Sequence, residues 1–142
     1  MIRDTLIPEL VRRFAGLGLC LGDAPDPIAS IPAKHADVGD VMIYDDGDEA
    51  TVAIGKIFHD HFNPYDESLS TAQRDQFVTK AVVDFLNDFF ADRILLWVSK
   101  SGQSAGLISL NGPPKPEDLS DVKQYAAGEA LVYLWSGPVD LS

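Results

Sequence analysis

The 142-residue sequence contains a single cysteine, Cys20, and this scarcity excludes several classes of protein. One thiol cannot form a disulfide within the chain, and it cannot build a zinc site from several thiolates. Cys20 lies among Leu17, Leu19 and Leu21. We therefore predict a buried, unreactive cysteine rather than a nucleophile.

Long apolar segments are also missing. The sequence contains no run of 18 apolar residues, the length that a membrane-spanning helix needs. Charged residues at Arg3, Asp4 and Glu9 interrupt the N-terminal region, so the apolar segment of a signal peptide is not found there. The sequence predicts a cytoplasmic protein that does not associate with membranes.

Basic residues are few. The chain contains 11 Lys and Arg residues and 22 Asp and Glu residues, so its formal net charge at pH 7 is −11. Nucleic-acid binding depends on cations that replace counterions, so we expect no nucleic-acid partner. Such a charge attracts a basic protein partner instead. The simpler interpretation is that the acidic surface only keeps the protein in solution.

Signatures of catalysis are absent as well. The chain has no Gly-x-Ser-x-Gly, no His-Glu-x-x-His, no phosphate-binding loop and no dinucleotide fingerprint. Nothing in the sequence assembles a nucleophile with a base, so an enzyme is not favoured.

What is present is the composition of a globular protein. Hydrophobic residues make up 46% of the chain and charged residues 23%. This length and balance predict a single α+β domain over residues 1–142.

Two helices are indicated by apolar periodicity. The first spans residues 5–19 and should begin near Leu6 or Ile7, because Pro8 is tolerated only in a first turn. The second follows a capping box at Ser70 and Gln73 and runs to about residue 90, with Phe77 in its apolar stripe.

The remaining segments predict strands. Residues 40–44 and 50–62 form a hairpin around an acidic turn, and residues 27–32 could add an edge strand. Residues 93–100 are apolar on both faces and should be central; residues 105–110 and 129–136 follow, with a helical turn at 119–125. We predict an α+β fold with a mostly antiparallel five- to six-stranded sheet and two main helices packed on it.

Carboxylates are concentrated in two turns, and we predict that they bind a basic partner. They are Asp45, Asp46, Asp48, Glu49, Asp66 and Glu67. A hairpin turn enriched in Asp and Gly is also common without any binding role.

His59 and His61 suggest a different site. Residues i and i+2 of a strand point the same way, so the two imidazoles could hold one zinc ion. The candidates for the third ligand are His35, Asp66 and Glu67. Zinc with an open position activates water, which makes a metal-dependent hydrolase the alternative function. Two histidines near the end of a strand are also common as surface residues.

The acidic chain, its strand at 50–62 and its helix-to-strand segment at 85–97 resemble small acidic immunity proteins of bacterial toxin systems. The resemblance implies a non-catalytic, immunity-type inhibitor that binds a basic toxin domain, and it assigns no individual residue a role. A small ligand-binding or oligomeric scaffold domain is the third alternative.

Overall fold

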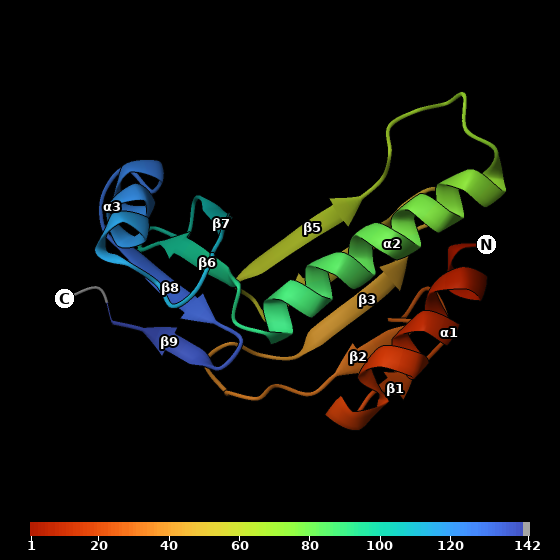
Figure 1. Ribbon diagram of the computed structural model, residues 1–142, viewed down its shortest axis with the longest axis horizontal. Helices are drawn as coiled ribbons and strands as arrows, with labels where there is room; N and C mark the ends of the chain where they lie inside the picture. The colour runs from red at the N-terminus through yellow and green to blue at the C-terminus, as the bar shows by residue number, and fades with distance from the viewer. Residues whose placement is uncertain (141–142) are drawn as a thin grey trace.

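The computed structural model describes residues 1–140, which form three α-helices and nine strands arranged as two antiparallel sheets (Figure 1). The α+β class is therefore confirmed. The strands divide between a five-stranded sheet, sheet A, and a four-stranded sheet, sheet B, instead of forming one sheet of five or six strands. Residues 141 and 142, which the predicted domain includes, lie outside the described residues.

The first half of the chain builds sheet A and its two helices. In chain order the elements are α1 (Ile2–Phe14), the 3-10 helix η1 (Ala15–Leu17), β1 (Cys20–Leu21), β2 (Ala29–Ile31), β3 (Val41–Asp45), β4 (Ala50–Ile54), β5 (Phe58–Phe62) and α2 (Thr71–Phe90). The second half builds sheet B with α3. Its elements are β6 (Ile94–Ser99), β7 (Ala105–Ser109), α3 (Pro116–Tyr125), β8 (Ala130–Leu134) and β9 (Gly137–Val139).

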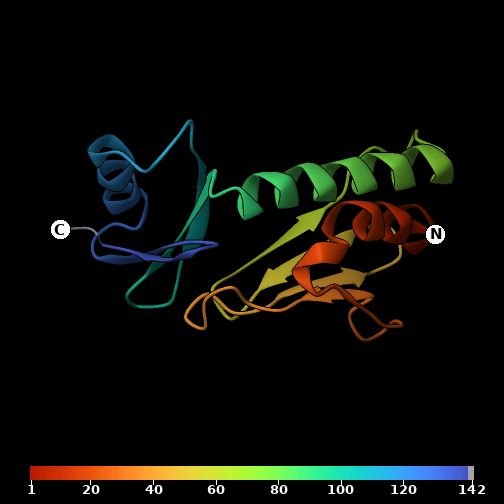
Figure 2. The same ribbon diagram turned by 60° about the horizontal axis from the view of Figure 1, so that its bottom comes forward.

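Sheet A is an antiparallel meander whose strands follow the order of the chain. Alternation in β4 buries Ala50, Val52 and Ile54, because successive side chains of a strand point to opposite faces. Both α1 and α2 lie on this buried face (Figure 2). The predicted edge strand at 27–32 is instead an interior strand, since β1 pairs with the outer side of β2.

Helix α1 buries Ile2, Leu6, Leu10 and Phe14, which recur every four residues. It begins at Ile2, so the prediction of a start near Leu6 or Ile7 was wrong. Pro8 lies inside the helix on its exposed side, where water can satisfy the backbone carbonyl that the missing N–H leaves free.

Helix α2 begins and ends as the sequence predicts. Ser70 and Gln73 form the capping box, with the Ser70 hydroxyl accepting from the Gln73 N–H at 3.1 Å. The inward stripe contains Val82, Leu86 and Phe89, all fully buried. Phe77, predicted to belong to the stripe, is 48% exposed, because the buried side of the helix is shifted toward Val78 and Thr79.

Residues 50–62 form two strands rather than the one long strand that we predicted. The chain reverses at Gly55, which has φ +51°, and a Cβ at this position would lie 2.3 Å from the carbonyl oxygen of Val38. Pairing of Ile54 with Phe58 keeps these two residues on the same face. The residues that we predicted to share the core face therefore do share it, although the predicted strand is folded back on itself.

Sheet B has β6 in its interior, between β7 and β8. Ile94 and Leu96 join the core that contains α1 and α2, whereas Leu95 and Trp97 join a second cluster under α3. The prediction of a central strand covered on both faces is thus confirmed. Helix α3 includes and extends the predicted helical turn at 119–125, and β9 was not predicted.

The two halves of the molecule are joined by aromatic packing at the end of α2. Trp135 contacts Phe89 and Phe90, with ring centroids 5.6 and 5.0 Å apart, so the first core reaches from sheet A to sheet B. Within residues 1–140, no helix combines the length and apolarity needed to cross a membrane.

Candidate functional site

One face of sheet A is covered by none of the described helices, because α1 and α2 both pack on the other face (Figure 2). Strand register arranges its side chains in two rows, which we call the open face. One row is Cys20, Ser30, Met42, Ala53 and His59, and the other is Tyr44, Thr51 and His61. Cys20 and the two histidines are exposed and the others are half-buried. The open face thus offers apolar, aromatic and polar groups to solvent together.

The exposure of Cys20 contradicts the prediction that it is buried. Its apolar neighbours in the sequence gave the wrong expectation because β1 is a two-residue edge strand, and neither Cys20 nor Leu21 is buried there.

The acidic turn between β3 and β4, residues 45–49, lies at one end of the open face, and we call it the hairpin tip. Its backbone is closed by a hydrogen bond from the Asp46 N–H to the Glu49 carbonyl at 2.9 Å. Gly47 has φ +92°, which glycine adopts without strain, and its N–H donates to Oδ1 of Asp45 at 2.9 Å. The turn is therefore specified by its own residues.

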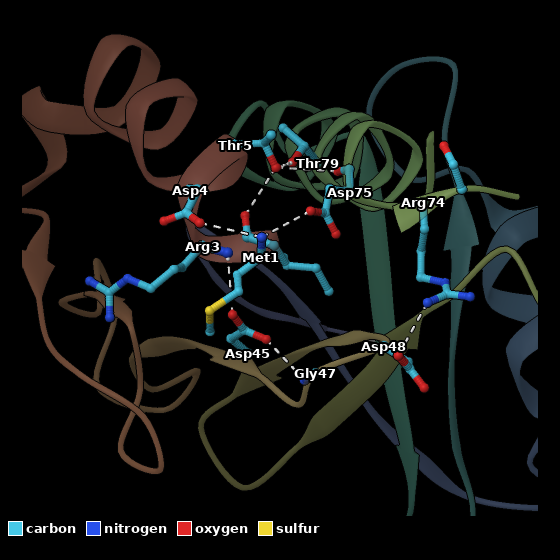
Figure 3. A network of polar contacts seen from close by, with 12 residues as sticks. Met1, Arg3, Asp4, Thr5, Asp45, Gly47, Asp48, Arg74, Asp75 and Thr79 are labelled. Carbon is cyan, nitrogen blue, oxygen red and sulfur yellow. Dashed lines mark hydrogen bonds and ion pairs between the residues drawn. The ribbon is translucent and has the colours of Figure 1, made fainter. Parts of the chain in front are cut away.

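Two of the predicted partner-binding carboxylates are used inside the molecule (Figure 3). Asp45 accepts the backbone N–H of Arg3 at 3.2 Å, so it ties the hairpin tip to the start of α1. Asp48 pairs with Arg74 of α2, with Oδ1 and Nη1 3.2 Å apart. These contacts hold the hairpin tip against the two helices.

Figure 3 also shows the ionic contacts that fix the start of α1. The Met1 amino group lies 3.2 Å from Oδ2 of the buried Asp75 and 3.3 Å from Oδ2 of Asp4. Hydrogen bonds with Asp75 and then Asp4 raise the pKa of this amino group above its ordinary value. Thr5 and Thr79 join the same two helices through hydroxyls 2.8 Å apart.

Asp66 and Glu67 lie in the connection from β5 to α2. The hydroxyl and then the backbone N–H of Ser68 donate to Asp66, and these hydrogen bonds lower the pKa of its carboxyl group below the ordinary value. These two acids line a hollow of about 240 Å³ together with Asp48, Asn63, Tyr65 and Arg74. Three of the predicted carboxylates are thus brought together, with Arg74 among them.

The other two carboxylates of the hairpin tip converge on His61. Nδ1 of His61 lies 2.8 Å from Oε2 of Glu49 and 2.9 Å from the hydroxyl of Thr51, and that hydroxyl donates to Oδ2 of Asp46. One ligand atom each from Asp46, Glu49 and His61 lies within 4.8 Å of the others. We refer to these three residues as the imidazole–carboxylate cluster.

The predicted histidine set is only partly brought together. His59 and His61 share the open face as expected, with ring centroids 5.4 Å apart, and the pairing of Asp60 with Val52 places Asp60 on the other face. His35 lies away from this pair and packs against Gly137 of β9. A Cβ added at Gly137 would lie 3.0 Å from the imidazole ring of His35. Its Nδ1 accepts the N–H of Asp37 at 3.1 Å.

Sequence reasoning missed the association between His61 and the hairpin tip. It assigned Asp46 and Glu49 to partner binding and His61 to a metal site. A turn at Gly55 would have been the useful signal, because folding residues 50–62 back on themselves sets Thr51 opposite His61.

Two larger hollows lie outside the open face. One of about 790 Å³ runs along β8 and β9, where Leu131 and Val139 are flanked by Lys100 and Glu129. Another of about 580 Å³ lies between α1 and α2 and is lined mainly by charged residues.

No protein-family model matches this chain, and no curated protein or solved structure matches it at a significant level.

Proposed function

We propose that this protein is a non-catalytic interaction domain that binds a basic protein partner through the open face of sheet A and the hairpin tip. The observation that carries the proposal is a broad strand surface, free of any described helix, that ends in a group of carboxylates. An immunity-type inhibitor, which acts by covering the surface of a basic toxin domain, is the form of this function that we favour.

Charge supports a basic partner. The chain carries a net charge of −11, and complementary charge accelerates encounter and fixes orientation. Among the described residues, Asp46 and Glu49 form no ion pair with Lys or Arg, whereas Asp48 already pairs with Arg74. Asp46 and Glu49 therefore keep negative charge that no Lys or Arg of the described residues offsets.

The chemistry of the open face supports a protein partner in particular. Tyr44 and Met42 lie side by side near the middle of the sheet, with the Tyr44 hydroxyl 3.7 Å from the Met42 sulfur. Tyr and Met are enriched in protein interfaces, where a partly apolar centre is surrounded by a polar rim. Here the rim is acidic at the hairpin tip.

The test is a comparison of two double charge reversals with equal change in charge. Asp46→Lys with Glu49→Lys alters the hairpin tip, and Glu117→Lys with Asp121→Lys alters exposed positions of α3. The ligand is a basic protein recovered from the native host at low salt, or one encoded beside this protein. Affinity is measured by titration calorimetry at low and high sodium chloride.

We expect the hairpin-tip variant to bind at least about tenfold more weakly and the α3 variant to keep the affinity of the wild type. Affinity of the wild type should also fall with salt, because exposed charges are screened. Equal losses in both variants, or binding that salt leaves unchanged, would contradict the proposal. Asp48→Lys is a less direct test, since it also breaks the pair with Arg74.

A further inference from the structure

We infer that the imidazole–carboxylate cluster binds one divalent transition-metal ion, such as Zn²⁺ or Mn²⁺. Asp46 and Glu49 belong to the hairpin tip and His61 belongs to β5, and one ligand atom from each of the three lies within 4.8 Å of the others. This site differs in composition from the His59–His61–His35 set that the sequence predicts.

The spacing of the ligand atoms suits an ion. Tetrahedral bonds of about 2.0–2.2 Å from zinc to nitrogen or oxygen put neighbouring ligand atoms roughly 3.3–3.6 Å apart. Nδ1 of His61 and Oε2 of Glu49 are 2.8 Å apart. The three ligand atoms all lie within 4.8 Å of one another, so the observed spacings bracket that of a coordination sphere, and rotation of the Asp46 and Glu49 side chains is the adjustment that an ion requires.

The donor set selects the class of metal. One imidazole and two carboxylates suit zinc, manganese and related ions, whereas calcium and magnesium prefer oxygen ligands alone. The two carboxylates repel each other, and among the described residues neither pairs with Lys or Arg. A bound cation removes that repulsion.

The backbone holds the ligands in place before any ion arrives. The Asp46 N–H to Glu49 carbonyl hydrogen bond fixes the turn, and the register sets Thr51 directly opposite His61. His59 is on the same face, its ring 5.4 Å from that of His61, and is the candidate for a fourth ligand. A site supported by paired strands loses less conformational entropy on binding than a free loop does.

The experiment uses the full chain, purified without a His-tag and freed of metal by chelation. Co²⁺ is added while visible absorption reports coordination, and Zn²⁺ affinity follows from competition. The variants are His61→Ala and Glu49→Gln, with His59→Ala to test the fourth ligand, and His35→Ala is the matched control because His35 lies against Gly137. Far-UV circular dichroism verifies that each variant is folded.

We expect one ion per chain in the wild type, and an affinity at least about tenfold lower in His61→Ala and in Glu49→Gln. His35→Ala should bind as the wild type does. The inference is overturned by a wild type that binds no Co²⁺ or Zn²⁺, by a folded His61→Ala that keeps full affinity, or by an equal loss in His35→Ala. It is also overturned by Ca²⁺ binding as tightly as Zn²⁺.

The metal site and the basic partner use the same two carboxylates, Asp46 and Glu49, but their tests are separable. Metal affinity is measured on the protein alone, so failure to bind metal leaves the partner proposal standing. Loss of partner binding in the charge-reversal variants likewise leaves the metal measurement on the wild type unaffected.

Discussion

Replacing Phe89 by alanine should destabilise the protein more than most single substitutions would. Phe89 is fully buried at the end of α2, and its ring is 6.0 Å from Phe85, 5.9 Å from Phe90 and 5.6 Å from Trp135 between centroids. Removing a buried Phe costs about 3–5 kcal/mol in total. Aromatic pairs are each worth about 0.5–1.5 kcal/mol beyond area burial, so a ring with three such partners lies in the upper part of that range. We therefore expect a loss of about 4–5 kcal/mol.

The expected change in melting temperature follows from this loss of free energy and from the length of the chain. An unfolding entropy of about 2.1 cal/mol/K per residue, applied to this chain, corresponds to roughly 3 °C for each kcal/mol. Phe89→Ala should thus melt about 12–15 °C below the wild type. Because domains are stable by only about 5–15 kcal/mol, Phe89→Ala could leave little folded protein, and Phe89→Leu is a milder second variant. It keeps most of the apolar volume but loses the aromatic pairs, so we expect a cost of about 1.5–3 kcal/mol.

Phe77 provides the matched control. It belongs to the same helix but is 48% exposed, so Phe77→Ala should cost under about 1 kcal/mol. Urea unfolding followed by far-UV circular dichroism and by tryptophan fluorescence gives the free energies, since the buried Trp135 lies beside Phe89. If Phe77→Ala costs as much as Phe89→Ala, or Phe89→Ala costs less than about 2 kcal/mol, the packing described for α2 is wrong.

Two further predictions concern the backbone and the N-terminus. Gly55→Ala should destabilise the protein by about 2–5 kcal/mol in urea unfolding, because Gly55 has φ +51° and its new Cβ would lie 2.3 Å from the Val38 carbonyl oxygen. Gly16→Ala, which meets no atom within 4 Å, is the control, and an equal cost in both would refute this reading of the turn. In a chain that begins with a free amino group at Met1, the raised pKa of that group means that its stabilisation is complete below about pH 8 and is lost as pH rises through the folded-state pKa. Thermal melts should show stability declining above pH 8 in the wild type, and Asp75→Asn should remove most of this dependence; an unchanged pH profile in Asp75→Asn would count against the ion pair.

Local patterns were sufficient for the elements that are stabilised within their own segments. The capping box at Ser70, the turn around Gly47 and the two-faced strand β6 were all predicted, because each depends on residues close together in the chain. The α+β class and the antiparallel pairing follow from the same signals.

Predictions failed where distant contacts override local preference. Pro8 suggested a late start for α1, yet burial of Ile2 against the core extends the helix toward the N-terminus. Cys20 looked buried from its neighbours in the sequence, but an edge strand leaves it exposed.

In the candidate site, too, some features follow from the sequence and others depend on the tertiary structure. The sequence alone determined which residues could act, since carboxylates at the hairpin tip and alternating histidines in β5 are visible from composition and period-two spacing. Only the tertiary structure decided that His61 meets Asp46 and Glu49 rather than His35, because that choice depends on strand register across the turn at Gly55. The turn at Gly55 sets this register, and Gly55 is required there because its backbone lies against Val38, a contact between segments that are apart in the sequence.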